Sequence, residues 1–134
     1  MIAALLLAFG LATACAAGAP PPTAASAELL GMPLASPEVV DLLRVAYEES
    51  GDAAYVRRII DALPWEEGGE RRRIVSTAAD LAGMYLVYAA QDDDRVLGTC
   101  RDEAGRRTGL VRTQLLGIVE HAETMRARAA EAVE

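Results

Sequence analysis

The chain has 134 residues and a formal net charge of −7, because 20 acidic side chains outnumber 13 basic ones, all of them arginine. This length suits one domain. The acidic balance argues against binding to nucleic acid and against electrostatic docking on anionic lipid, both of which need a basic surface. Hydrophobic residues make up 52% of the chain but aromatic residues only 4%, so the predicted core is aliphatic.

The first segment, residues 1–14, contains no charged side chain and carries an apolar run, residues 2–11, as long as the apolar region of a signal peptide. A membrane-spanning helix would need about 20 strongly apolar residues. The run continues into Leu11-Ala12-Thr13-Ala14-Cys15, which resembles the lipobox of bacterial lipoproteins. The resemblance implies transfer of diacylglycerol to the Cys15 sulfur and cleavage between Ala14 and Cys15, so we expect a lipid anchor on Cys15.

The leader departs from the lipoprotein pattern in two ways. No Lys or Arg precedes the apolar run, and Ala12 stands where a larger aliphatic residue is commoner. The alternatives are ordinary secretion, with cleavage after Ala14 or Ala17, and an uncleaved membrane anchor. The same resemblance implies an outer-membrane protein in a Gram-negative source, because Ala16 and not Asp follows Cys15. We expect a cell-envelope protein anchored to a bacterial membrane, with a periplasmic or secreted protein as the alternative.

Residues 15–35 are expected to be a flexible, lipidated tether between the signal peptide, residues 1–14, and a helical domain, residues 36–134. Small side chains dominate this segment, and residues 20–22 are three prolines that favour an extended polyproline conformation. Apolar residues gather near its end, and we expect them to pack on the edge of the domain, with a short partner-binding segment as the alternative: Leu29, Leu30, Met32 and Leu34.

The domain is predicted to be all-α, a four-helix bundle-like fold with two short and two long helices, and no strand-like alternation is found. Ser36 and Pro37 are typical of a helix start, and Gly51 of a helix end. A second helix is expected between Asp52 and Pro64. The long helices are expected at about residues 71–90 and 106–132.

The third and fourth helices differ in their apolar pattern. From Leu81 to Ala90 the third is apolar all round, so we expect it to be the central helix. The fourth repeats apolar residues in steps of four and three from Val111 onward, a heptad-like seam that would also allow a homodimer. Gly83 and Gly117 lie inside these helices, where we expect them to permit close helix approach.

The stretch from Leu43 to Leu63 resembles a single tetratricopeptide hairpin. Leu43, the pair Ala46-Tyr47 and the pair Gly51-Asp52 have the matching spacing. The match covers about one repeat and no second copy follows, whereas a solenoid needs several repeats. A generic helical hairpin is therefore the alternative.

Three groups of residues are candidate sites. His121 and Met125 are four residues apart and could place two metal ligands on one helix face, but the sequence offers them no partner ligand. Residues 92–94 are three consecutive aspartates that, with Asp102 and Glu103, predict a mobile, exposed acidic loop and not a calcium loop. Arginines at 71–73 are expected to open the third helix and to pair with Glu66, Glu67 and Glu70.

Three single residues are also candidates for a special role. Cys100 is expected to be buried and unreactive once Cys15 is lipidated. Asp80 is the best candidate for a perturbed carboxylate, and Trp65 is either a packing plug or an exposed binding anchor. No set of nucleophile and base is found, so we assign no catalytic, cofactor-binding or metal residue.

The sequence therefore predicts a non-enzymatic, membrane-tethered envelope lipoprotein whose small helical domain serves binding or assembly with an envelope protein partner. The alternative is a helical bundle that binds a small ligand in an apolar pocket lined by Tyr47, Met84, Tyr85 and Tyr88. A contiguous exposed apolar face would favour the first function, and a closed cavity would favour the second.

Overall fold

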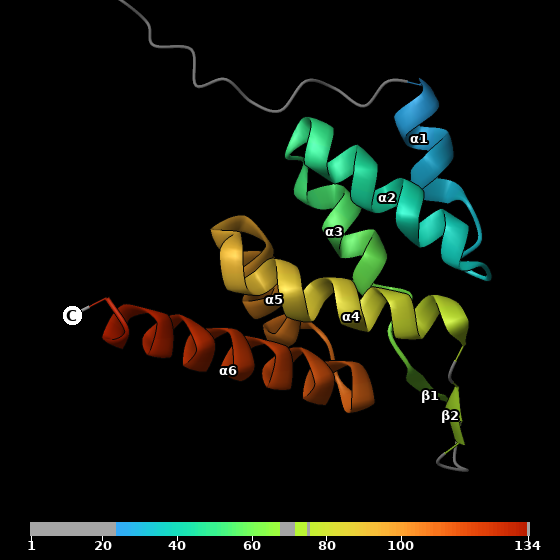
Figure 1. Ribbon diagram of the computed structural model, residues 1–134. Helices are drawn as coiled ribbons and strands as arrows, with labels where there is room; N and C mark the ends of the chain where they lie inside the picture. Colours follow the sequence, from blue (N-terminus) through green and yellow to red (C-terminus); the bar gives the residue numbers. More distant parts are fainter. Residues whose placement is uncertain (1–23, 68–71, 75, 134) are drawn as a thin grey trace, which may run out of the picture.

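The computed structural model describes residues 24–67, 72–74 and 76–133, in which six helices pack around one core (Figure 1). The predicted signal peptide, Cys15 and the first part of the predicted tether lie outside the described residues. Among the described helices, none combines the length and the apolar character needed to cross a bilayer. The elements in chain order are α1 (Ala24–Gly31), α2 (Pro37–Ser50), α3 (Ala53–Ile60), β1 (Trp65–Glu67), β2 (Arg72–Ile74), α4 (Thr77–Asp92), α5 (Asp94–Arg106) and α6 (Gly109–Glu131).

Helix α4 lies at the centre of the fold, as predicted, and contacts α2, α3, α5 and α6. Its inward side is completely buried at Ala82, Leu86 and Ala90. The core around it is aliphatic, which confirms the expectation from composition. Its largest fully buried side chains outside α4 are Val40, Leu43, Val56, Ile59, Ile60, Leu63, Val96, Cys100 and Leu115.

Helices α2 and α3 form a helical hairpin whose turn is set by two residues. Gly51 adopts a left-handed conformation, with φ of 69°, and its N–H donates to the Tyr47 carbonyl at 2.7 Å. The Asp52 carboxylate then accepts from the Ala54 N–H at 2.9 Å and caps α3. These helix boundaries match the predicted stop at Gly51 and start at Asp52.

The all-α class is confirmed, but the predicted count of four helices is wrong. The predicted helices correspond to α2, α3, α4 and α6, and the described residues contain two more. Helix α1 falls in the segment predicted to be a tether. The apolar residues near the end of this segment pack against the core, as predicted: Leu29, Leu30, Met32 and Leu34.

Helix α5 replaces the predicted acidic loop. The Asp93 N–H donates to the Ala89 carbonyl at 2.8 Å and closes α4. The Asp93 carboxylate accepts from the N–H groups of Arg95 and Val96, at 2.8 and 3.3 Å, and so starts α5. One aspartate therefore joins two helices directly, and Glu103, which was assigned to the loop, is buried in α5.

A short hairpin occupies the place where the third helix was expected to begin. Strands β1 and β2 are antiparallel, with Glu66 opposite Arg73 and Glu67 opposite Arg72. Helix α4 begins only at Thr77, where the Ser76 hydroxyl accepts from the Ala79 N–H at 3.1 Å. The predicted start of this helix at about residue 71 is thus wrong, because residues 72–74 form an extended strand paired with β1. Glu70 and Arg71 lie outside the described residues.

The middle of the heptad-like seam of α6 packs against the core of the same chain. Leu115, Ile118 and Ala122 are buried in the core that α6 forms with its neighbours α4 and α5. Close helix approach does not explain the two mid-helix glycines. A Cβ at Gly117 would meet open space, and one at Gly83 would make an ordinary contact at 3.9 Å to Leu63.

Candidate functional site

The outer face of α4 is apolar but uncovered. Met84 is 59% exposed and Tyr88 is 67% exposed, although Leu86 between them is completely buried. The burial predicted from the all-round apolar character of this helix holds only for its inner side. An exposed apolar stripe of this kind is a candidate binding surface.

Helix α2 forms the second wall of a groove beside this stripe. One hollow of about 390 Å³ lies between the two helices, lined by Arg44, Glu48, Leu81, Met84, Tyr85, Tyr88, Ala89 and Asp92. A second hollow of about 430 Å³ is lined by Pro37, Glu38, Asp41, Leu42 and Leu81. Both hollows are lined by Leu81 and therefore adjoin at that residue, and we call the two together the α2–α4 groove.

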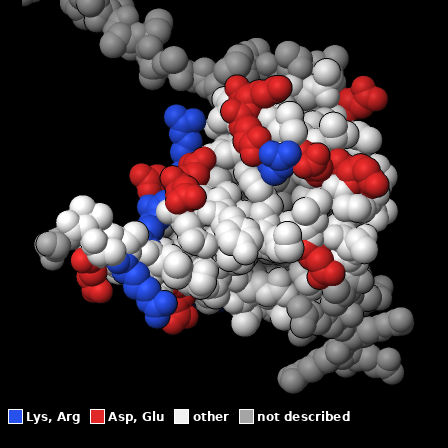
Figure 2. Space-filling model, viewed as in Figure 1, with Lys and Arg blue, Asp and Glu red and all other residues white. Residues whose placement is uncertain are grey.

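The rim of the groove is acidic. In Figure 2 a row of acidic side chains, with one basic group among them, runs beside a broad uncharged surface. Arg44 is the basic residue among those lining the groove. Its guanidinium is held by Asp41 at 2.9 Å and by Glu48 at 2.7 Å, one turn away on either side. The ion pairs fix Arg44 along the rim and leave the groove with an excess of negative charge.

Tyr85 brings a polar group to the groove. Burial, followed by the negative charges of Glu48 and Asp93, raises the pKa of Tyr85 to about 12. The hydroxyl is therefore protonated at neutral pH and can donate a hydrogen bond to a bound molecule.

Tyr47 does not line the groove, contrary to its predicted place in the pocket. It is buried, and its hydroxyl donates to the Asp93 carboxylate at 2.7 Å. Burial and this hydrogen bond raise the pKa of Tyr47 far above its usual value. Burial alone would raise the pKa of Asp93, but the bonds from Tyr47 and from the N–H groups of Arg95 and Val96 outweigh it and lower that pKa. The contact ties α2 to the junction of α4 and α5.

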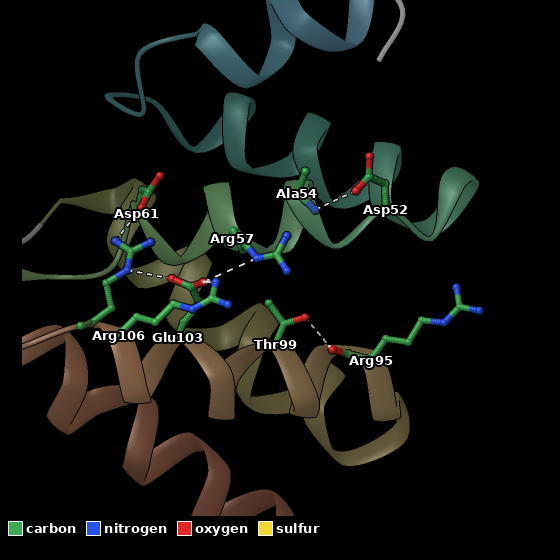
Figure 3. A network of polar contacts seen from close by, with 9 residues as sticks. Asp52, Ala54, Arg57, Asp61, Arg95, Thr99, Glu103 and Arg106 are labelled. Atoms are coloured by element: carbon green, nitrogen blue, oxygen red, sulfur yellow. Dashed lines mark hydrogen bonds and ion pairs between the residues drawn. The ribbon is translucent and has the colours of Figure 1, made fainter. Parts of the chain in front are cut away.

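A second polar cluster lies between α3 and α5 (Figure 3). Glu103 is only 4% exposed, and its oxygens contact Arg57 at 3.5 Å, Arg106 at 3.2 Å and Arg107 at 2.9 Å. Arg107 also bonds Asp61 at 2.7 Å. Since guanidinium groups occupy both carboxylate oxygens, Glu103 acts as a structural tie between the two helices.

The remaining predicted residues lie apart from the groove. His121 and Met125 do share one face of α6, where they line a shallow hollow. The described residues contain no group of three or more His, Cys, Asp or Glu side chains placed to hold a metal ion. Cys100 is buried and free, as predicted, and burial raises the pKa of its thiol to about 12. Asp80 is an exposed residue in the first turn of α4.

Trp65 is 44% exposed at the start of β1, which favours the predicted binding anchor over the packing plug. Leu42 and Arg44 line the groove but were not predicted as site residues. Their signal was present in α2, where Leu42 adds an apolar residue beside the core position Leu43, and where Asp41, Arg44 and Glu48 have ion-pair spacing.

Comparison with protein-family models, with curated proteins and with solved structures finds no match to this chain.

Proposed function

We propose that this chain is an exported, membrane-tethered protein without catalytic activity, whose helical domain docks a protein partner in the α2–α4 groove. The observation that supports docking is the exposure of Met84 and Tyr88 on a helix whose opposite side forms the centre of the core. Large exposed apolar side chains that adjoin a groove are typical of protein interaction sites.

The tether belongs to the same proposal. The lipobox-like sequence ending at Cys15 supports a lipid anchor, and the acidic chain would otherwise lack attraction to anionic lipid. Mass spectrometry of the mature N-terminus tests it, with a diacylglyceryl-modified Cys15 as the expected result. A chain that begins at Gly18, or with an unmodified Cys15, would refute the anchor without affecting the groove.

Docking is tested by placing a photo-crosslinking amino acid at position 84 or 88 in cells that make the protein. The matched control places it at Leu116, which is 50% exposed on α6 and lies outside the groove. We expect a discrete protein adduct from the groove positions and none from position 116. Equal adducts from all three positions, or an adduct with twice the mass of the chain, would refute docking of a different protein.

Binding of a small ligand is the second candidate function. Three of the four residues predicted for such a pocket, Met84, Tyr85 and Tyr88, do line a hollow of about 390 Å³. The hollow is open along the groove, however, and a small ligand is usually enclosed on most of its surface. Native mass spectrometry of the purified chain would show a bound small molecule if this function is correct, and the Met84→Gln variant would lose it.

A further inference from the structure

The floor of the α2–α4 groove runs along α4. Leu81, Met84, Tyr85 and Tyr88 follow one another at helical spacing along α4, and the hollows on either side of Leu81 extend the depression along α2. From Leu81 to Asp92 the helix rises about 16 Å, or three turns. A trough of this length between two helices fits the apolar face of a third helix, with anchors spaced by three or four residues.

The charge of the groove restricts the partner further. Four carboxylates line the two hollows, from Glu38, Asp41, Glu48 and Asp92, against the single guanidinium of Arg44. Arg44 is already paired with two of them, so Glu38 and Asp92, one near each end of the groove, are available to a partner. Complementary charge on a partner means Lys or Arg beside its apolar face.

A second copy of the chain is a poor occupant. Each copy carries a net charge of −7, and the middle of the heptad-like seam of α6, at Leu115, Ile118 and Ala122, is already buried within its own fold. Joining two acidic surfaces of this kind would place like charges together.

We propose that the α2–α4 groove binds an amphipathic helix of about three turns whose apolar face is flanked by Lys or Arg. This inference rests on the docking function proposed above and adds the shape and charge of the partner. The apolar anchors would lie on Leu81, Met84 and Tyr88, and the basic side chains would contact Glu38 and Asp92.

Two designed helical peptides of about 15 residues test this inference. Both carry the same leucine face, which is flanked by lysines in one peptide and by glutamates in the other. Their affinities for the unlipidated full chain are measured by fluorescence anisotropy at low and high salt. The variants are Met84→Gln and Tyr88→Gln for the floor and Glu38→Gln with Asp92→Asn for the rim, with Leu116→Gln as the matched control.

We expect the lysine peptide to bind at least about tenfold more tightly than the glutamate peptide, and high salt to reduce the difference. Floor variants should weaken the lysine peptide about tenfold or more, and the rim variant should weaken it several-fold, whereas Leu116→Gln should leave it unchanged. Equal binding of both peptides would overturn the charge assignment.

Failure of this inference can be distinguished from failure of the docking function. If neither peptide binds but position 88 still crosslinks to a protein in cells, the groove docks a partner of another kind, and only the inference is overturned. If neither peptide binds and no crosslink forms, both proposals are wrong.

Discussion

At the residue scale, the carboxylate of Glu103 forms ion pairs with more arginines than any other acid in the described residues. Three arginines share it, and it is nearly buried although the arginines are partly exposed. Removing its charge leaves those arginines without their common partner in a partly desolvated position. The cost is set by the buried group, because exposed ion pairs contribute little.

We therefore expect Glu103→Gln to lower the free energy of unfolding by about 1–3 kcal/mol. The matched control is Glu123→Gln, which breaks the exposed pair with Arg101 and should cost less than about 1 kcal/mol. Urea denaturation of both variants measures the difference. Equal losses would show that the cluster between α3 and α5 contributes no more than a surface ion pair.

Tyr47 and Asp93 connect stability to pH. The pKa of Asp93 is lowered in the folded chain, so its contribution to stability is present above the unfolded pKa of about 3.9 and is lost as the pH falls through the lower folded value. Tyr47→Phe removes the hydroxyl that donates to this carboxylate and keeps the buried ring.

We expect Tyr47→Phe to raise the pKa of Asp93 and to cost about 1 kcal/mol of stability at neutral pH, a cost that shrinks below about pH 4. Carboxyl NMR titration measures the pKa, and chemical denaturation at several pH values measures the stability. Tyr88→Phe, at an exposed tyrosine, is the control and should show neither effect. An unchanged Asp93 pKa in Tyr47→Phe would contradict the assigned hydrogen bond.

At the element scale, two glycines differ in whether their helix requires them. Gly51 ends α2 with φ of 69°, and a Cβ there would come within 2.5 Å of the Arg95 guanidinium. Gly117 lies inside α6, where a Cβ would meet open space. Only the first position needs glycine.

Gly51→Ala should therefore lower the free energy of unfolding by about 1–2 kcal/mol, whereas Gly117→Ala should raise it by up to about 1 kcal/mol. Thermal unfolding of the two variants would show shifts of opposite sign. A stabilised Gly51→Ala variant would contradict the left-handed end of α2.

Local signals in the sequence predicted some elements and not others. Ser36, Pro37, Gly51 and Asp52 mark helix ends by their own chemistry, so α2 and the start of α3 were predictable. Asp93 uses the same local chemistry, but it ends α4 and caps α5 at once, so no loop residue separates the two helices. Because Asp93 stands between two other aspartates, the sequence predicted an acidic loop there, and α5 was not predicted.

The residues of the groove were also only partly predictable from the sequence. The apolar pattern of α4 predicted a central helix, and that is correct for Leu86 and Ala90. Which apolar side chains remain uncovered depends on how many helices pack around α4, and the sequence does not state that number. Met84 and Tyr88 therefore became recognisable as a surface only with the fold.

At the scale of the whole molecule, one side of α4 belongs to the core and the opposite side is exposed along the groove. Leu86 is completely buried, so Leu86→Ala should lower the free energy of unfolding by about 2–5 kcal/mol by leaving a cavity.

Met84→Gln and Tyr88→Gln replace exposed side chains, so each should change the free energy of unfolding by less than about 0.5 kcal/mol. The same two variants should also raise solubility, because they remove exposed apolar area. Chemical denaturation and measurement of soluble concentration check these outcomes together. A large loss of stability in either glutamine variant would mean that the stripe is part of the core, and the proposed docking surface would then lack its physical basis.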